Sequence, residues 1–168
     1  MRQVQRGQTL GWVLGAVIAI TVGVSGQTAD PLSGTWKLNL ANSKYSPASL
    51  APKSGTTKFE VTKTTVKTIT DGVDGQGRVT HSEYTATLDG KDSPWKGTLD
   101  GRPNPDQDAI AWKKIDDYTY ELVNKLKGQV LTTQRTVIAR DGKTRTNTVT
   151  GKNAQGQTVN HTVVYERQ

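Results

Sequence analysis

The sequence contains no cysteine and only two histidines, and these absences limit the chemistry open to the chain. Without cysteine there is no disulfide framework and no lipid-modified N-terminal cysteine. A zinc or copper site would have to combine His81 or His161 with carboxylates from separate segments. We therefore expect no metal site and no cofactor.

Large apolar side chains are also scarce. Hydrophobic residues make up 33% of the chain, which has a single phenylalanine, while threonine is used heavily. This composition does not favour two sheets packed around a thick apolar core, but it allows a barrel with a partly polar interior. A chain of 168 residues is expected to form one domain.

One long apolar run is present, near the N-terminus. Two arginines precede an apolar stretch over residues 10–24, and small residues follow at 24–26, which is the pattern of a secretory signal. A membrane span needs about 20 residues, so this run of about fifteen is short for one, although an uncleaved anchor is the alternative. We predict a signal peptide over 1–26, a domain over 27–168, and export to the bacterial periplasm or medium.

The charge balance is mildly basic. The full chain carries a formal net charge of +7, and removal of residues 1–26 leaves 20 basic and 15 acidic residues, a net charge of +5. Most lysines and arginines alternate with apolar residues or threonine, which is typical of a solvated strand face and not of a nucleic-acid-binding stripe. We expect a monomer that binds no nucleic acid and has no membrane span after signal cleavage.

The alternation of apolar and polar residues is the main pattern after residue 26, where no amphipathic helix is predicted. In "GTWKLNL", for example, Trp36, Leu38 and Leu40 share one face. Turn residues interrupt the alternation about every ten to fifteen positions, as in a sandwich or barrel. We expect an all-β fold of about ten antiparallel strands in an up-and-down meander that closes into a barrel.

The middle of the chain is its least regular part. "DGKD" is predicted to be a hairpin turn, and "SPWKGTL" a single short strand that Pro94 places at an edge or bulge. The stretch "DGRPNPDQ" that follows is predicted to be a loop.

The two ends of the domain resemble a known superfamily. "GTWKL" at 34–38 resembles the opening strand of the calycins, the lipocalins and fatty-acid-binding proteins, where Gly-x-Trp lets the strand bend and the indole plugs the closed end. "VYER" at 164–167 resembles the closing strand of the intracellular fatty-acid-binding proteins. The stretch "GTWKLNLANSKYSP" further resembles secreted bacterial lipocalin-like proteins of unassigned function. The resemblance implies a calycin-like barrel that holds a small ligand.

Two features of the family are missing. Long fatty-acid-binding proteins have two helices after the first strand, but "ANSKYSPASLAPKSG" is too short and proline-rich for them, so we expect an open mouth or an irregular flap. The family's carboxylate clamp places an arginine two residues before a tyrosine. Here Tyr165 matches the tyrosine, but the arginine positions correspond to Val163 and, on another strand, to a residue near Val137. Arg135, assigned to the same inward face, could hold an anionic head group instead; alternatively it points to solvent or stacks over Trp36.

The alternation on three strands defines the candidate ligand site. Residues predicted to line the interior are Tyr120, Leu122, Arg135, Val137, His161, Val163 and Tyr165, with Thr146 and Thr148 as further candidates. The apolar members would bury the ligand and the tyrosines would orient it. Tyr165 could equally be a core residue whose hydroxyl bonds to a threonine.

The sequence does not favour catalysis. There is no Gly-x-Ser-x-Gly motif, and His81 and Ser82 are adjacent, so they point to opposite faces of a strand. We expect no enzyme and no catalytic residue. The leading hypothesis is an exported protein that sequesters or carries a small hydrophobic or amphiphilic ligand. The alternative is a ligand-free barrel that acts as an interaction or inhibitor module; an enzyme using His161 with Tyr165 is least supported.

Overall fold

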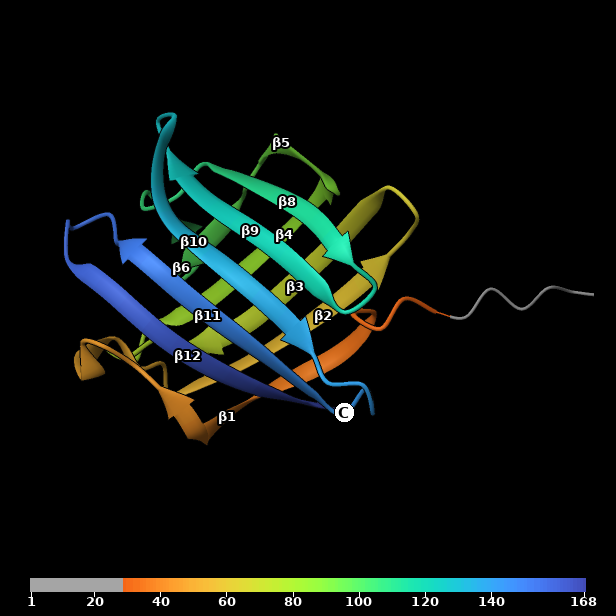
Figure 1. The fold of residues 1–168 in the computed structure, drawn as a ribbon. Helices are drawn as coiled ribbons and strands as arrows, with labels where there is room; N and C mark the ends of the chain where they lie inside the picture. Colours follow the sequence, from red (N-terminus) through yellow and green to blue (C-terminus); the bar gives the residue numbers. More distant parts are fainter. Residues whose placement is uncertain (1–28) are drawn as a thin grey trace, which may run out of the picture.

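The computed structural model describes residues 29–168, which form a single antiparallel sheet of twelve strands (Figure 1). The strands are β1 (Gly34–Lys44), β2 (Ser54–Val61), β3 (Thr65–Val73), β4 (Val79–Thr87), β5 (Asp89–Pro94), β6 (Gly97–Leu99), β7 (Arg102–Pro103), β8 (Ala109–Asp116), β9 (Thr119–Leu126), β10 (Gln129–Ile138), β11 (Thr144–Lys152) and β12 (Thr158–Arg167). A 3₁₀ helix, η1 (Ala48–Leu50), lies between β1 and β2. The predicted signal peptide lies outside the described residues, and none of those residues forms a helix long and apolar enough to span a membrane.

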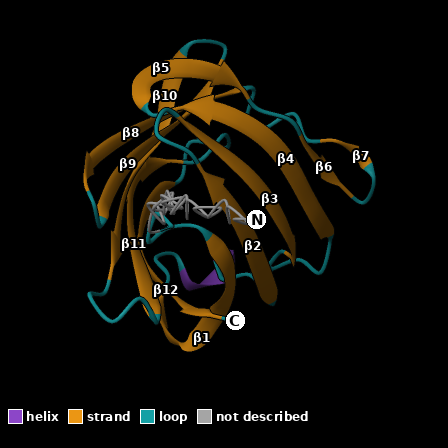
Figure 2. Ribbon diagram, turned by 90° about the vertical axis from the view of Figure 1, so that its right-hand side faces the viewer, coloured by secondary structure: helices purple, strands orange, loops and turns teal. Residues whose placement is uncertain are grey.

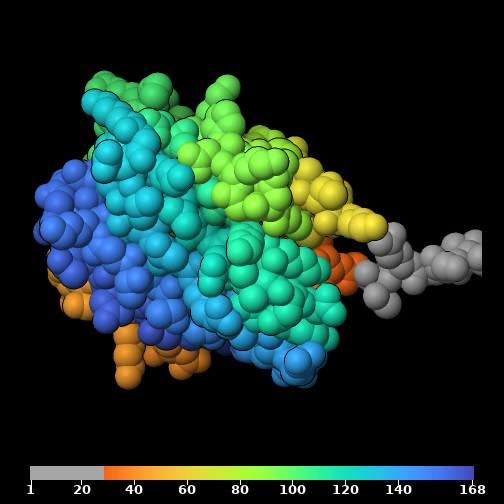
Figure 3. Space-filling model, turned by 45° about the horizontal axis from the view of Figure 1, so that its top comes forward, coloured from red at the N-terminus to blue at the C-terminus, as the bar shows by residue number. Residues whose placement is uncertain are grey.

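The sheet curls on itself, and its order is β5-β8-β9-β10-β11-β12-β1-β2-β3-β4-β6-β7 (Figure 2). Most neighbours are consecutive in the chain, as an up-and-down meander requires. The last strand pairs with the first, with Trp36 opposite Arg167, so "VYER" lies beside "GTWKL". In the space-filling view, orange residues of the first strand accordingly emerge next to blue residues of the last (Figure 3).

Closure of the barrel is incomplete, because the edge strands β5 and β7 do not pair with each other. We call the gap between the two edges of the sheet the seam. At one end of the seam the backbone of Leu88 bridges the gap. Its N–H donates to the carbonyl of Thr64 at 2.9 Å, and its carbonyl accepts from the N–H of Lys114 at 3.2 Å. Further along the seam, the N–H of Trp95 donates to the carbonyl of Asp108 at 2.9 Å, and the carbonyl of Lys96 accepts from the N–H of Glu83 at 3.3 Å. The fold is therefore a curled sheet that is tied at Leu88 and at Trp95–Lys96, not a fully hydrogen-bonded cylinder.

The prediction of ten strands is wrong, and the difference lies at this seam. The stretch predicted as one strand is divided, because β5 pairs with β8 while β6 pairs with β4. The predicted "DGKD" turn belongs to β5, and the short β7 forms within the predicted loop. The chain crosses the seam at Trp95, whose indole would overlap any Cβ at Gly97. A glycine is thus required where the chain changes its pairing partner.

The two ends of the barrel differ in how they are filled. We call the end with the turns at 62–64, 117–118 and 139–143 the closed end, and the end with η1 and the turns at 74–78 and 153–157 the mouth. The large core side chains are Leu32, Trp36, Phe59, Val66, Tyr84, Leu88, Ile110, Trp112, Tyr120, Leu122 and Ile138. Among the inward residues nearer the mouth, Thr57, Ser82 and Asn147 are smaller and polar. The interior is therefore apolar toward the closed end and partly polar toward the mouth.

Trp36 is fully buried, and its indole N–H donates to the carbonyl of Leu32 at 2.9 Å. The guanidinium of Arg167 lies over the indole ring, 4.3 Å from its centroid, and donates to the carbonyls of Pro31, Ser33 and Gly142. Gly34 has a φ of +126°, and a Cβ there would overlap that guanidinium. The Gly-x-Trp pattern is thus explained by contacts with the last strand.

Candidate functional site

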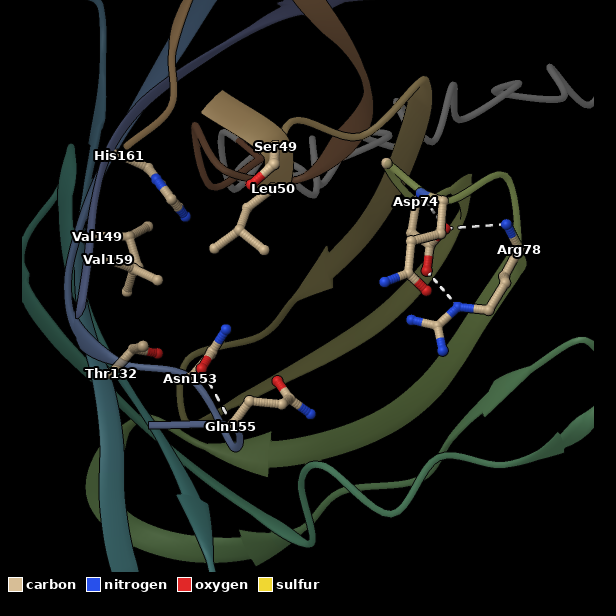
Figure 4. Close-up of a pocket in the computed structure, with 12 residues that line it drawn as sticks. Ser49, Leu50, Asp74, Arg78, Thr132, Val149, Asn153, Gln155, Val159 and His161 are labelled. Atoms are coloured by element: carbon tan, nitrogen blue, oxygen red, sulfur yellow. Dashed lines mark hydrogen bonds and ion pairs between the residues drawn. The ribbon is translucent and has the colours of Figure 1, made fainter. Parts of the chain in front are cut away.

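A cavity of about 310 Å³ lies in the barrel mouth (Figure 4). One wall comes from the inward faces of β11 and β12, where Val149, Val159 and His161 point toward Leu50 of η1. Thr132 of β10 lies below them. Apolar side chains therefore form the wall of the cavity nearest to η1.

A segment that we call the mouth flap, residues 45–53, crosses this end of the barrel and is held on the β12 side. The N–H of Ser46 donates to Nδ1 of His161 at 3.2 Å, and the carbonyl of Ser46 accepts from the N–H of Asn160 at 3.0 Å. The ring of Tyr45 packs against that of His161, with 5.0 Å between centroids. The flap is thus attached to the same strand that forms the cavity wall.

The flap also contacts the opposite rim. A Cβ on Gly75, in the turn between β3 and β4, would lie 2.8 Å from the carbonyl oxygens of both Ser49 and Ala51. The N–H of Lys53 donates to the carbonyl of Val73 at 2.8 Å. Because both sides are attached, a molecule that enters the cavity here must displace or pass the flap.

His161 is the titratable group closest to the apolar wall. Burial lowers the pKa of His161 below its ordinary value of 6.5, and this effect exceeds the opposing one of the Asn160 backbone. The neutral ring that burial favours can accept the Ser46 N–H at Nδ1, which places its own proton on Nε2. The flap contact therefore depends on His161 being uncharged.

The far rim carries an ion pair that is satisfied within its own turn. Asp74 accepts from the side-chain Nε of Arg78 at 2.7 Å and from the backbone N–H groups of Gln76 and Arg78, each at 2.9 Å. Burial alone would raise the pKa of Asp74, but the hydrogen bonds from Arg78 and Gln76 outweigh it and lower the pKa. The rim therefore adds polarity to the cavity but no net charge.

The structure places five of the predicted site residues on the inner side of the sheet, but at different depths. His161 lines the mouth cavity, whereas Val163, only 6% exposed, lies one inward step deeper on β12. Tyr120 and Leu122 belong to the apolar core of the barrel. The hydroxyl of Tyr120 is bonded to Asp30. Tyr165 packs against that core, so only His161 of this group contacts the cavity.

The inward orientation predicted for Arg135 and Val137 is wrong. Val137 is 42% exposed, and Arg135 reaches Glu121 on the outer surface at 3.4 Å. Directly paired residues point to the same face of a sheet. Because Thr136 pairs with the buried Tyr120, Thr136 faces inward and its two neighbours face outward. A shift of one residue reverses every side chain of a strand, and this is the error made here.

The same reversal affects β11. Thr146 and Thr148 alternate with Arg145 and Asn147, which are 2% and 5% exposed. Arg145 is paired in register with Tyr165, and its guanidinium lies over the Tyr165 ring at 4.0 Å from the centroid. Arg145 faces inward because it pairs with Tyr165, which points into the barrel, and the sequence of β11 alone does not indicate this pairing.

Comparisons with known proteins yield likenesses to solved structures alone. No protein-family model matches the chain, and no curated protein has a significantly similar sequence. Among solved structures, a redesigned β-barrel, mFAP1, bound to DFHBI is similar with 16% identity and a TM-score of 0.40, over 82% of this chain and 95% of that chain. At this TM-score, no inference about family or ligand follows.

Proposed function

We propose that the chain is an exported binding protein that sequesters or carries a small amphiphilic molecule in the mouth of its barrel, without chemical turnover. The cavity of about 310 Å³ carries this proposal. Ligand sites are concave, about 300–1,000 Å³, and combine apolar walls with a few placed polar groups. The cavity has both features, in the valines of β11 and β12 and in His161 with the polar rim.

Export and the absence of turnover are parts of the same proposal. The charged and apolar pattern over residues 1–26 supports export, and the calycin resemblance at the two chain ends supports a carrier. Among the residues that line the cavity, His161 is hydrogen-bonded to a backbone N–H and the Asp74–Arg78 pair is bonded internally. Neither arrangement presents a nucleophile activated by a neighbouring base.

A second function is favoured by a specific observation. The apolar core fills the closed end, and the mouth flap is already hydrogen-bonded across the other end. A barrel that is filled and covered in this way would act through its outer surface, as an envelope or secreted interaction module. The presence or absence of a bound molecule separates the two functions.

The test combines native mass spectrometry of the protein purified from its own host with titration of fluorescent amphiphiles. We expect a discrete additional mass that organic extraction removes. Val149→Trp, which fills the cavity, should weaken probe binding at least about tenfold, a loss of about 1.4 kcal/mol. The matched control is Val137→Trp on the outer surface, which should bind normally. A clean mass together with no uptake of neutral or anionic probes would establish the interaction module instead.

A further inference from the structure

Among residues 29–168, Arg145 is a buried cation without an acidic partner. Its side chain projects from β11 into the barrel and is 2% exposed. Its Nε and Nη2 have no hydrogen-bond partner, although the atoms are fully enclosed. Each of these N–H groups has lost its contact with water without gaining an acceptor, which is an unfavourable state for a guanidinium.

Aromatic rings surround this guanidinium but cannot supply what it lacks. The ring centroids of Tyr165, Phe59 and Trp36 lie 4.0, 4.9 and 5.6 Å from its central carbon. Such rings attract a cation through their faces. The N–H bonds of a guanidinium lie in its plane and need lone pairs, which aromatic faces do not provide. The rings thus stabilise the charge and leave the N–H groups unpaired.

The charge persists at neutral pH. Burial lowers the pKa of Arg145 to about 10, while the nearby Tyr165 and Tyr84 act in the opposite direction. The side chain is therefore still protonated around pH 7. The other arginine near Trp36 offers nothing to a ligand, since Arg167 donates to three backbone carbonyls. One uncompensated positive charge remains inside the barrel.

A third unpaired polar atom belongs to the same region. The hydroxyl oxygen of Thr68 is buried without a partner. Thr68 is paired across the sheet with Phe59, whose ring contacts Arg145, and with Tyr84. In the described part of the chain, the buried side-chain atoms without partners belong only to Thr68 and Arg145. The guanidinium of Arg145 can only donate, and the hydroxyl of Thr68 can donate as well as accept.

We propose that Arg145 forms a binding site for a monoanion inside the barrel, with the hydroxyl of Thr68 as a further donor. The anion would accept the Nε and Nη2 hydrogen bonds and neutralise the single buried charge. A carboxylate suits the paired N–H groups of a guanidinium, and such charge-assisted bonds are the strong ones. Sulfate, a dianion, carries too much charge for one unpaired cation in an apolar core.

The position of Arg145 relative to the mouth defines two sources for the anion. Arg145, Asn147 and Val149 follow one another on the inner face of β11, and Val149 lines the cavity. At about 3.3 Å per residue, the Cα atom of Arg145 lies roughly 13 Å along β11 from that of Val149, toward the closed end. The anion is therefore either the carboxylate of an amphiphile whose tail occupies the mouth, which rests on the proposed function, or a free monoanion such as formate.

The direct test observes the Nε–H signal of Arg145 in the ¹⁵N NMR spectrum of the wild-type protein, assigned by its loss in Arg145→Met. We expect the signal to shift saturably on addition of formate or of dodecanoate, and not with sulfate at equal ionic strength. A shift with both anions identifies a free monoanion site, and a shift with dodecanoate alone identifies an amphiphile head group. A signal unmoved by either overturns the proposal.

Dodecanol has the apolar tail of dodecanoate without its charge. Comparing the binding of the two therefore distinguishes a failure of this proposal from a failure of the proposed function. If dodecanol and dodecanoate both bind while the Arg145 signal stays unchanged, the mouth binds amphiphiles but Arg145 holds no anion. If neither amphiphile binds and formate shifts the signal, the anion site exists and the proposed function fails. The titration itself uses the wild-type chain, and Arg145→Met serves only to assign the signal.

Variants then test the recognition chemistry. Arg145→Met should weaken dodecanoate binding at least about tenfold relative to dodecanol, because it removes the charge and the donors but keeps an unbranched chain. Arg145→Lys keeps the charge but loses the planar fork, so its affinity for dodecanoate relative to dodecanol should lie between those of the wild type and Arg145→Met. Arg135→Met on the outer surface is the matched control and should leave the ratio unchanged. An unchanged ratio in Arg145→Met would also overturn the proposal.

Discussion

The phenol of Tyr120 donates to the carboxylate of Asp30, whose two oxygens lie 2.6 and 2.7 Å from it across 90 residues of sequence. The ammonium of Lys114 approaches the same carboxylate at 2.7 Å. Burial is the main cause that raises the pKa of Tyr120, followed by its bond to Asp30. The segment before β1 is thereby attached to β8 and β9, so Tyr120 serves the closed end and not the mouth.

Asp30→Asn should destabilise the fold by about 1–3 kcal/mol, because the amide weakens two charge-assisted contacts in a mostly buried position. Denaturant unfolding measures this change. Asp117→Asn is the matched control, since Asp117 also faces Lys114, at 3.7 Å, but its side chain is 84% exposed. Equal effects of the two variants would show that only the charge near Lys114 matters.

Trp36→Ala should cost about 3–5 kcal/mol of unfolding free energy, because it leaves a large cavity beneath Leu32 and removes the ring over which Arg167 lies. Trp95→Ala should cost less, since Trp95 only packs against the edge of the core. Thermal and denaturant unfolding of both variants test whether Trp36→Ala causes the larger loss of stability. A nearly neutral Trp36→Ala would contradict its role in closing the barrel.

Acidification should loosen the mouth flap before it unfolds the barrel. Because burial lowers the pKa of His161, the closed flap is fully stable above about pH 6.5 and loses stability as the pH falls through the lowered pKa. A protonated ring carries a hydrogen on Nδ1 and cannot accept the Ser46 N–H. The charged groups that line the same cavity, Asp74 and Arg78, are paired with each other and do not offset this charge.

Hydrogen exchange of the Ser46 amide, corrected for its intrinsic pH dependence, measures this loosening. Protection should fall below pH 6.5 in the wild type and be absent at every pH in His161→Phe. His81→Phe is the control, because His81 lies on the outer surface beside Asp71. Protection that does not change with pH in the wild type would show that the Ser46–His161 bond does not hold the flap.

Arg145→Met should raise the stability of the protein by about 1–3 kcal/mol in buffer without monoanions, since replacing a buried charge by an apolar chain of similar length removes its desolvation penalty. Arg135→Met, at an exposed position, should change stability by no more than about 0.5 kcal/mol. Urea unfolding of both variants measures the two changes in stability. Marked destabilisation by Arg145→Met would mean that the three aromatic rings outweigh the burial of the charge.

Whether a site residue faces inward or outward could be predicted only on strands with a clear alternation of apolar and polar residues. On β12, the alternation of His161, Val163 and Tyr165 correctly predicts an inward face. On β10, threonines occupy both faces, and on β11 the face opposite the threonines carries Arg145 and Asn147, so composition does not distinguish inside from outside. The register with β9 and β12 decides, and it turns Arg135 outward and Arg145 inward.

The sequence by itself determined the all-β class and the meander, because alternation and turn residues are local signals read directly from neighbouring positions. The pairing of the two chain ends was expected from the resemblance of "GTWKL" and "VYER" to the end strands of known barrels. Only the tertiary structure decided the division of strands at the seam, the attachment of the mouth flap to His161 and the burial of Arg145. These features depend on which strands meet. A single-residue change of register reverses a whole strand face, and no local pattern in a threonine-rich chain records it.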